Sequence, residues 1–123
     1  MEIGKRNWVF CDGYLPPHGD NPAFEGHEAL MLTNLNKEAA EIELTFVFED
    51  KDPIEGIRYT LDAMRTTCIR LDQPLGKQGL MLGEAVQYTV WVKSNIGVCA
   101  CFGRLDVRQT NMAYYSVEGY SFD

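Results

Sequence analysis

With 123 residues, 46% of them hydrophobic, and no linker rich in Pro, Gly or Ser, the chain fits one domain, residues 1–123, with one core. A formal net charge of −7 and eleven scattered Lys and Arg residues disfavour general nucleic-acid binding, because the phosphate backbone is also negative. No apolar signal-peptide segment and no run of about 18 apolar residues occurs, which predicts a cytoplasmic protein.

The first polar segment, residues 11–22 with the sequence CDGYLPPHGDNP, is predicted to be a loop. Its two glycines and its Pro-Pro pair disfavour a helix and make the segment stiff. A stiff loop loses little conformational entropy when it closes around a ligand. Its polar side chains are Asp12, Tyr14, His18 and Asp20.

Hydrophobic residues at every second position predict β-strands along the rest of the chain. In residues 40–50 the core-facing side chains are Ile42, Leu44, Phe46 and Phe48, and the alternating positions are Glu41, Glu43, Thr45 and Val47. Further strands are expected at residues 27–35, 56–63, 66–72, 85–93, 97–102 and 112–120, with a turn at 94–97. Without an amphipathic helix, this pattern predicts an all-β fold, an antiparallel β-sandwich of about seven or eight short strands.

The strand at residues 85–93 is apolar on both faces, because Val90, Trp91 and Val92 are consecutive. With Val90 and Val92 in the core, Trp91 is left on the outer face. An apolar outer face on a small domain indicates a subunit interface, which predicts a homo-oligomer. The alternative is that a loop covers Trp91.

The four cysteines, Cys11, Cys68, Cys99 and Cys101, all lie in apolar stretches. Cys99 and Cys101 form a C-x-C motif whose side chains share one face of a strand. No second Cys or His pair has the spacing of metal ligands. We therefore expect buried thiols, no disulfide and no zinc.

The segment GRLDVRQ places Arg104, Asp106 and Arg108 on one side of an extended chain. Asp106 would hold one arginine while the other contacts a ligand; the alternative is a purely structural Arg104–Asp106 pair. Together with residues from other strand ends, this segment predicts a site for a small, polar, hydroxyl-rich or carboxylated molecule. We expect the ligand-binding residues to converge within one subunit or across a subunit boundary; they are Tyr14, His27, Glu28, Arg65, Arg104, Asp106 and Asn111.

No catalytic motif is present, and we predict neither a cofactor nor a metal ion. Two enzymatic alternatives remain open for a carbohydrate-like substrate. His18, His27 and Glu28 could meet as a metal triad, or Glu28 and Asp106 could act as the two carboxylates of a glycosidase.

Four motifs, in this order and over nearly the whole chain, resemble the sensory rhodopsin transducer family of small bacterial proteins: GYLPPHG, GHEALMLTNLN, FVFEDKDP with RYTLDAMRT, and GRLDVRQTNMAYYS. The resemblance implies a β-sandwich subunit, a compact homotetramer and, in some members, a soluble partner of a membrane photoreceptor. It also implies a small-molecule binding domain, with sugars or related molecules as ligands.

The sequence departs from the family pattern at three places. Gly26 precedes His-Glu where the family has Ser, and Met64 replaces the first Arg of A-R-R-T. The residues before R-L-D, 101–103, are less polar than is usual. These changes leave the expected fold intact. They affect the expected identity of the ligand and the expected partnership with a photoreceptor.

Overall fold

The structure is a computed structural model that describes all 123 residues, and its regular elements are all β-strands. The strands are β1 (Lys5–Tyr14), β2 (His27–Asn34), β3 (Ala40–Phe48), β4 (Ile54–Leu61), β5 (Arg65–Arg70), β6 (Gln87–Asp106), β7 (Ala113–Val117) and β8 (Tyr120–Phe122). Every pairing between them is antiparallel. The prediction of an all-β antiparallel fold is confirmed. The structure contains no helix long and apolar enough to cross a membrane.

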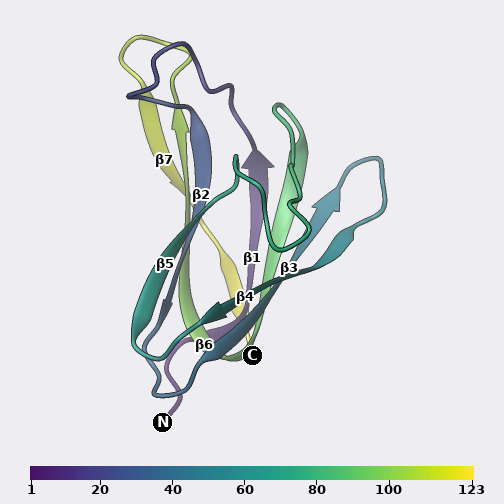
Figure 1. The fold of residues 1–123 in the computed structure, drawn as a ribbon, viewed down its shortest axis with the longest axis vertical. Helices are drawn as coiled ribbons and strands as arrows, with labels where there is room; N and C mark the ends of the chain where they lie inside the picture. Colours follow the sequence, from purple (N-terminus) through teal and green to yellow (C-terminus); the bar gives the residue numbers. More distant parts are fainter.

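The strands form two layers that share β6 (Figure 1). Sheet A has the order β4-β3-β6-β1-β8, and sheet B has the order β5-β2-β6-β7. Along β6, pairing with β3 ends at Ser94 and pairing with β2 begins at Cys99. The strand therefore bends between these residues as it passes from one layer to the other.

The prediction of a turn at residues 94–97 is wrong, because these residues lie inside β6, a single strand of 20 residues. The two halves of β6 pair with different strands, so no hairpin turn is needed between them. Gly97 has another reason to be a glycine. A Cβ atom at this position would lie 2.5 Å from the carbonyl oxygen of Ile3 and 2.7 Å from that of Gly4, so the N-terminal backbone occupies the space of a side chain.

Replacing Gly97 with alanine should therefore destabilise the protein by about 1–3 kcal/mol, the usual cost of overpacking. The contacts are with backbone atoms, which cannot move aside as the end of a flexible side chain would. Urea denaturation of Gly97→Ala and the wild type measures the difference. An unchanged midpoint would mean that residues 1–4 do not pack against β6.

The core is one cluster of 18 buried residues. Five of the residues predicted for it are buried, with exposed fractions of 0–2%: Ile42, Leu44, Phe46, Val90 and Val92. Phe48, near the edge, is only partly buried against the cluster. Thr45, predicted to face outward, is also buried, at 3% exposure, and is the register partner of Trp91.

The expectation that residues 11–22 form a loop is wrong at its start, because residues 11–14 belong to β1. Sequence analysis did not predict β1. The strand is irregular between Phe10 and Gly13, where its pairing with β6 shifts. Gly13 lies against the ring of Tyr88, and a Cβ there would be 2.3 Å from that ring. The loop therefore begins only at Leu15.

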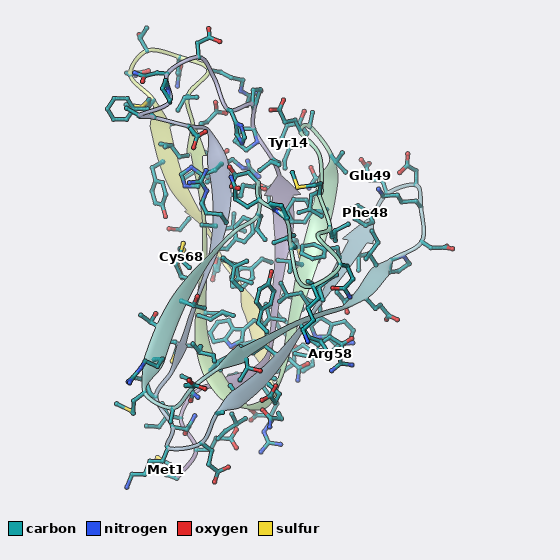
Figure 2. The ribbon with its side chains drawn as sticks, viewed as in Figure 1. Met1, Tyr14, Phe48, Glu49, Arg58 and Cys68 are labelled. Atoms are coloured by element: carbon teal, nitrogen blue, oxygen red, sulfur yellow. The ribbon has the colours of Figure 1, made fainter.

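The expectation of buried thiols is also wrong. Cys11, Cys68 and Cys101 are exposed and Cys99 is half-buried; all four are free thiols (Figure 2 labels Cys68). The cysteines occupy outward-facing positions of their strands. The apolar residues next to them in the sequence, such as Phe102, occupy the inward-facing positions.

Candidate functional site

The buried carboxylate of Glu28 joins both layers of the sandwich. Glu28 is the first inward residue of β2 and is fully buried. Its Oε2 accepts a hydrogen bond from Arg104 Nε at 2.8 Å, and its Oε1 accepts one from the Tyr88 hydroxyl. The backbone N–H of Tyr14, at the end of β1, also donates to the carboxylate, at 3.0 Å to Oε2. Every polar atom of this side chain therefore has a partner.

Arg104 connects this carboxylate to the surface. It lies opposite Glu28 in the register of β2 and β6 and is 7% exposed. Its Nη1 donates to the hydroxyl of Tyr115 and its Nη2 to the carbonyl oxygen of Asp12. Burial alone would lower the pKa of the guanidinium, but the hydrogen bonds to Glu28 and Tyr115 outweigh it and raise that pKa. Arg104 is therefore a fixed positive charge.

Tyr88 lies on the inner face of β6, in the core. Burial, together with the charge of the neighbouring Glu28 and the hydrogen bond to it, raises the pKa of its hydroxyl above the ordinary value. Tyr88 therefore stays protonated and donates to Glu28.

A hollow of about 420 Å³ lies on the surface beside this buried group. Its lining residues are Asp106, Arg108, Gln109, Ala113 and Tyr115. Arg108 donates from Nε and Nη2 to the Asp106 carboxylate, and these hydrogen bonds lower the pKa of Asp106. Asp106 thus holds Arg108, whereas Glu28 holds Arg104. The hollow offers a carboxylate, a guanidinium, an amide and a phenol.

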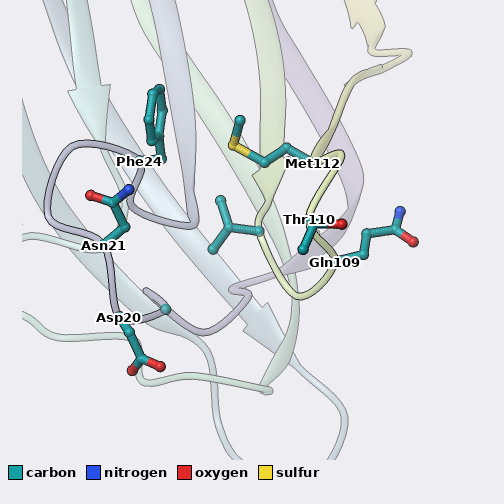
Figure 3. A pocket seen from close by; sticks show the side chains of 8 residues that line it. Asp20, Asn21, Phe24, Gln109, Thr110 and Met112 are labelled. Atoms are coloured by element: carbon teal, nitrogen blue, oxygen red, sulfur yellow. The ribbon is translucent and has the colours of Figure 1, made fainter.

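A second hollow, of about 380 Å³, separates the loop that follows β1 from the loop that follows β6 (Figure 3). Phe24 and Met112 face each other across it, and Val107 forms part of its lining. Gln109 lines both hollows, so the loop at residues 107–112 separates them.

Residues 3–121 match the sequence pattern of one protein family, described as Anabaena sensory rhodopsin transducer. The chain belongs to this family. Two solved structures of similar proteins agree. A Thermotoga maritima protein, 1070, is 32% identical, with a TM-score of 0.84 over 97% of this chain and 96% of its own. The Anabaena sensory rhodopsin transducer is 30% identical, with a TM-score of 0.75 over 90% of this chain and 96% of its own. No curated protein matches the sequence.

Of the residues expected to form the site of this transducer-family protein, Glu28 contacts two others: the guanidinium of Arg104 and the backbone N–H of Tyr14, whose side chain takes no part in this contact. Asp106 lies two residues beyond Arg104 and lines the first hollow. Asn111 is exposed in the loop between the two hollows.

His27 and Arg65 do not join this group. His27 pairs with Leu105 on the outer face of sheet B, and its Nδ1 contacts the carbonyl oxygen of Glu25. Arg65 pairs with Asn34, six residues along β2 from Glu28, which is roughly 20 Å at the rise of a β-strand. Arg65 therefore does not converge with the others within one chain, because β5 begins at the far end of sheet B, and its convergence across a subunit boundary stays a prediction.

The metal triad left open by the sequence does not form. His18 contacts Asp72 at 2.9 Å, and no three Cys, His, Asp or Glu side chains are placed to hold a metal ion. Asp72 is buried and also accepts hydrogen bonds from Arg70. Burial alone would raise the pKa of Asp72, but the hydrogen bonds from Arg70 lower it, and the carboxylate anchors the loop that carries His18.

Sequence reasoning missed two members of the site, Tyr88 and Tyr115. A signal for Tyr88 was present, because it shares the inward positions of β6 with Val90 and Val92. A buried tyrosine hydroxyl requires a hydrogen-bond partner. Tyr115 carries no such signal, since it is exposed and reaches Arg104 only because β7 pairs with the end of β6.

Proposed function

We propose that this protein is a signal-transducing module that binds a small polar molecule in the hollow at Asp106 and Arg108. The bound state would be passed to a membrane photoreceptor or another signalling protein in the cytoplasm. The observation that carries the proposal is the Arg104 guanidinium, which contacts Tyr115 at the hollow and Glu28 in the core. Membership of the transducer family supports the signalling role.

The chemistry of the hollow suits a sugar or a sugar acid. Arg108 and Gln109 donate hydrogen bonds, Asp106 accepts them, and the ring of Tyr115 offers an apolar face. Hydroxyl-rich ligands need donors and acceptors together, and a carboxylate on the ligand would pair with a guanidinium.

A ligand in this hollow can influence the whole sandwich. Tyr115 is on β7, Arg104 on β6, and Glu28 on β2, while Tyr14 brings the end of β1 to the same carboxylate. A contact that displaces the Tyr115 hydroxyl therefore changes the hydrogen bonding of Arg104 first. We propose that this chain of contacts reports ligand binding to the partner.

The geometry favours no enzymatic candidate. Glu28 is buried and all its oxygen atoms accept hydrogen bonds, and Asp106 is paired with Arg108. A glycosidase needs two carboxyl groups that act on the same substrate bond, and neither Glu28 nor Asp106 is free to act as such an acid or base. Binding without a covalent step is the better account of these groups.

Thermal shift with glucuronate and glucose tests the binding site. We expect glucuronate to raise the Tm of the wild type, since a ligand that binds only the folded state stabilises it. Arg108→Ala should weaken this binding by one to two orders of magnitude, because a charge-assisted hydrogen bond contributes about 1.5–3 kcal/mol.

Arg58→Ala is the matched control, because Arg58 is an exposed arginine on β4 with a carboxylate neighbour, Glu43, at 3.5 Å. It should bind glucuronate as the wild type does. Equal stabilisation of Arg108→Ala and the wild type would remove Arg108 from the site. If neither compound raised the Tm of the wild type, the hollow would not be a sugar site.

We also propose that the protein is a homotetramer, with the outer face of sheet A in a subunit interface. Trp91 lies half-buried on this face, beside Phe122 and near Tyr120 of β8. The hydroxyl of Thr45, opposite Trp91, is buried without a hydrogen-bond partner. Three aromatic side chains on the outer face of a small domain favour contact with another subunit over exposure to water.

A further inference from the structure

The outer face of sheet B carries a cluster of sulfur atoms that the proposed function does not use. Met31 on β2 lies opposite Cys101 on β6 and opposite Cys68 on β5. Cys99 is two residues from Cys101 and shares its face, because alternate residues of a strand point the same way. Cys68 and Cys101 are exposed, while Cys99 and Met31 are half-buried. Three thiols and one thioether therefore share one surface.

Neither core packing nor a disulfide explains this cluster. The thiols are not in the core, as described above. Cys68 and Cys101 are separated by β2, so their Cα atoms are roughly 9.5 Å apart at the usual strand spacing, too far for a disulfide. Cys99 and Cys101 lie along one strand, and their Cα–Cβ bonds are parallel. This geometry also does not allow a disulfide. The thiols cannot pair within the chain without a change in backbone.

We infer that Cys99, Cys101 and Met31 form a binding site for a soft monovalent metal ion, Cu(I). Thiolate and thioether sulfur are the ligands that select Cu(I). Zinc usually takes four nitrogen, sulfur or oxygen ligands, and no three Cys, His, Asp or Glu side chains gather to supply them. Cu(I) accepts two or three sulfur ligands, which is what these residues offer.

The strand geometry allows these three sulfur atoms to approach one ion. The Cα atoms of Cys99 and Cys101 are roughly 6.7 Å apart at the rise of a β-strand, and their side chains can turn toward each other. Met31 is directly opposite Cys101, at roughly 5 Å between Cα atoms, and has three rotatable side-chain bonds to adjust its sulfur. Cys68 lies on the far side of Met31 and is not needed.

Binding requires no change of oxidation state. Two thiols lose their protons to solvent as two Cu–S bonds form, and the thioether adds a third bond without losing a proton. The two thiolates and the Cu(I) ion together carry one negative charge.

Anaerobic titration of the folded protein with Cu(I), in competition with the chromogenic chelator bathocuproine disulfonate, tests the site. We expect the wild type to take up one Cu(I) per chain, with an ultraviolet thiolate-to-copper band. Cys101→Ser should lose this uptake. Met31→Leu, which nearly conserves volume, should lower the affinity at least about tenfold. Circular dichroism confirms that each variant is folded.

Cys11→Ser is the matched control, because Cys11 is an exposed thiol on β1, in sheet A. It should bind Cu(I) as the wild type does. Uptake that survives in Cys101→Ser, or falls equally in Cys11→Ser, would show unspecific binding to exposed thiols and overturn the site. So would a larger light-scattering mass on adding Cu(I), since the ion would then join separate assemblies.

Discussion

Replacing Glu28 with alanine should lower the free energy of unfolding by about 3–5 kcal/mol, because the substitution leaves a buried charge without its partner. Arg104 would keep its positive charge at 7% exposure, with two neutral hydrogen-bond acceptors and only the exposed Asp12 carboxylate, 3.7 Å from its Nη2, as a counter-charge. The hydroxyl of Tyr88 and the N–H of Tyr14 would lose their acceptor as well. Urea denaturation, monitored by tryptophan fluorescence, measures the loss.

Lys5→Ala is the control for the Glu28 substitution. Lys5 contacts Asp123 at 3.1 Å, a distance close to that of the buried pair, but both side chains are about half exposed or more. Exposed ion pairs contribute little, so Lys5→Ala should change the stability only slightly. A similarly small effect of Glu28→Ala would mean that water reaches Arg104 and that the site is not a rigid connection to the core.

Replacing Trp91 with glutamate should convert the proposed tetramer into single chains of 13.9 kDa. The change removes the largest aromatic group of the outer face of sheet A and places a carboxylate in the proposed interface. Burying that charge costs several kcal/mol, of which the ammonium of Lys93, 3.9 Å from the centre of the Trp91 ring, would offset only a part. Light scattering at micromolar concentration measures the mass.

Two further variants separate dissociation from unfolding. Tyr120→Glu adds the same charge on β8 of sheet A, at a residue that is already 68% exposed, and should weaken assembly without harming the core. Met81→Glu adds it at an exposed residue outside the strands and should leave the mass unchanged. A wild-type protein that scatters as a single chain would contradict the proposed tetramer.

The strand pattern was predictable wherever one face is buried and the other is wet. In β3, Ile42 and Leu44 alternate with Glu41 and Glu43, so the sequence itself separates the two faces. The point at which β6 passes from sheet A to sheet B cannot be predicted from this alternation. In both sheets every second residue of β6 faces the core, so the sequence pattern does not change where the strand changes layer. Gly97 was read as a turn signal although it serves a close backbone contact.

Two local errors share one cause, the use of composition in place of position. The cysteines were expected inside because their neighbours are apolar, yet Cys101 and Phe102 point to opposite sides of β6. Residues 11–14 were assigned to a loop because they include polar side chains and Gly13. Asp12 lies in the irregular part of β1, which remains a strand because β6 supplies its hydrogen bonds.

The candidate site was predictable in part, since Glu28 and Arg104 were singled out and lie opposite each other on neighbouring strands. Their partnership depends on the register of β2 with β6, which spacing along a chain does not determine. For the same reason the sequence does not reveal that β5 carries Arg65 to the far end of sheet B within the chain. The pairing of Asp106 with Arg108 follows from local spacing alone, because it spans only two residues.

The pairing of β1 has a consequence for the order in which the molecule can be made. The hydrogen-bond partners of β1 are β6 and β8, so β1 is completed only by strands that are synthesised long after it. Until residues 87–122 have emerged, β1 has no neighbouring strand, and both of its edges are open. Vectorial synthesis therefore cannot complete sheet A early, and the nascent chain must stay soluble through most of its length before it folds.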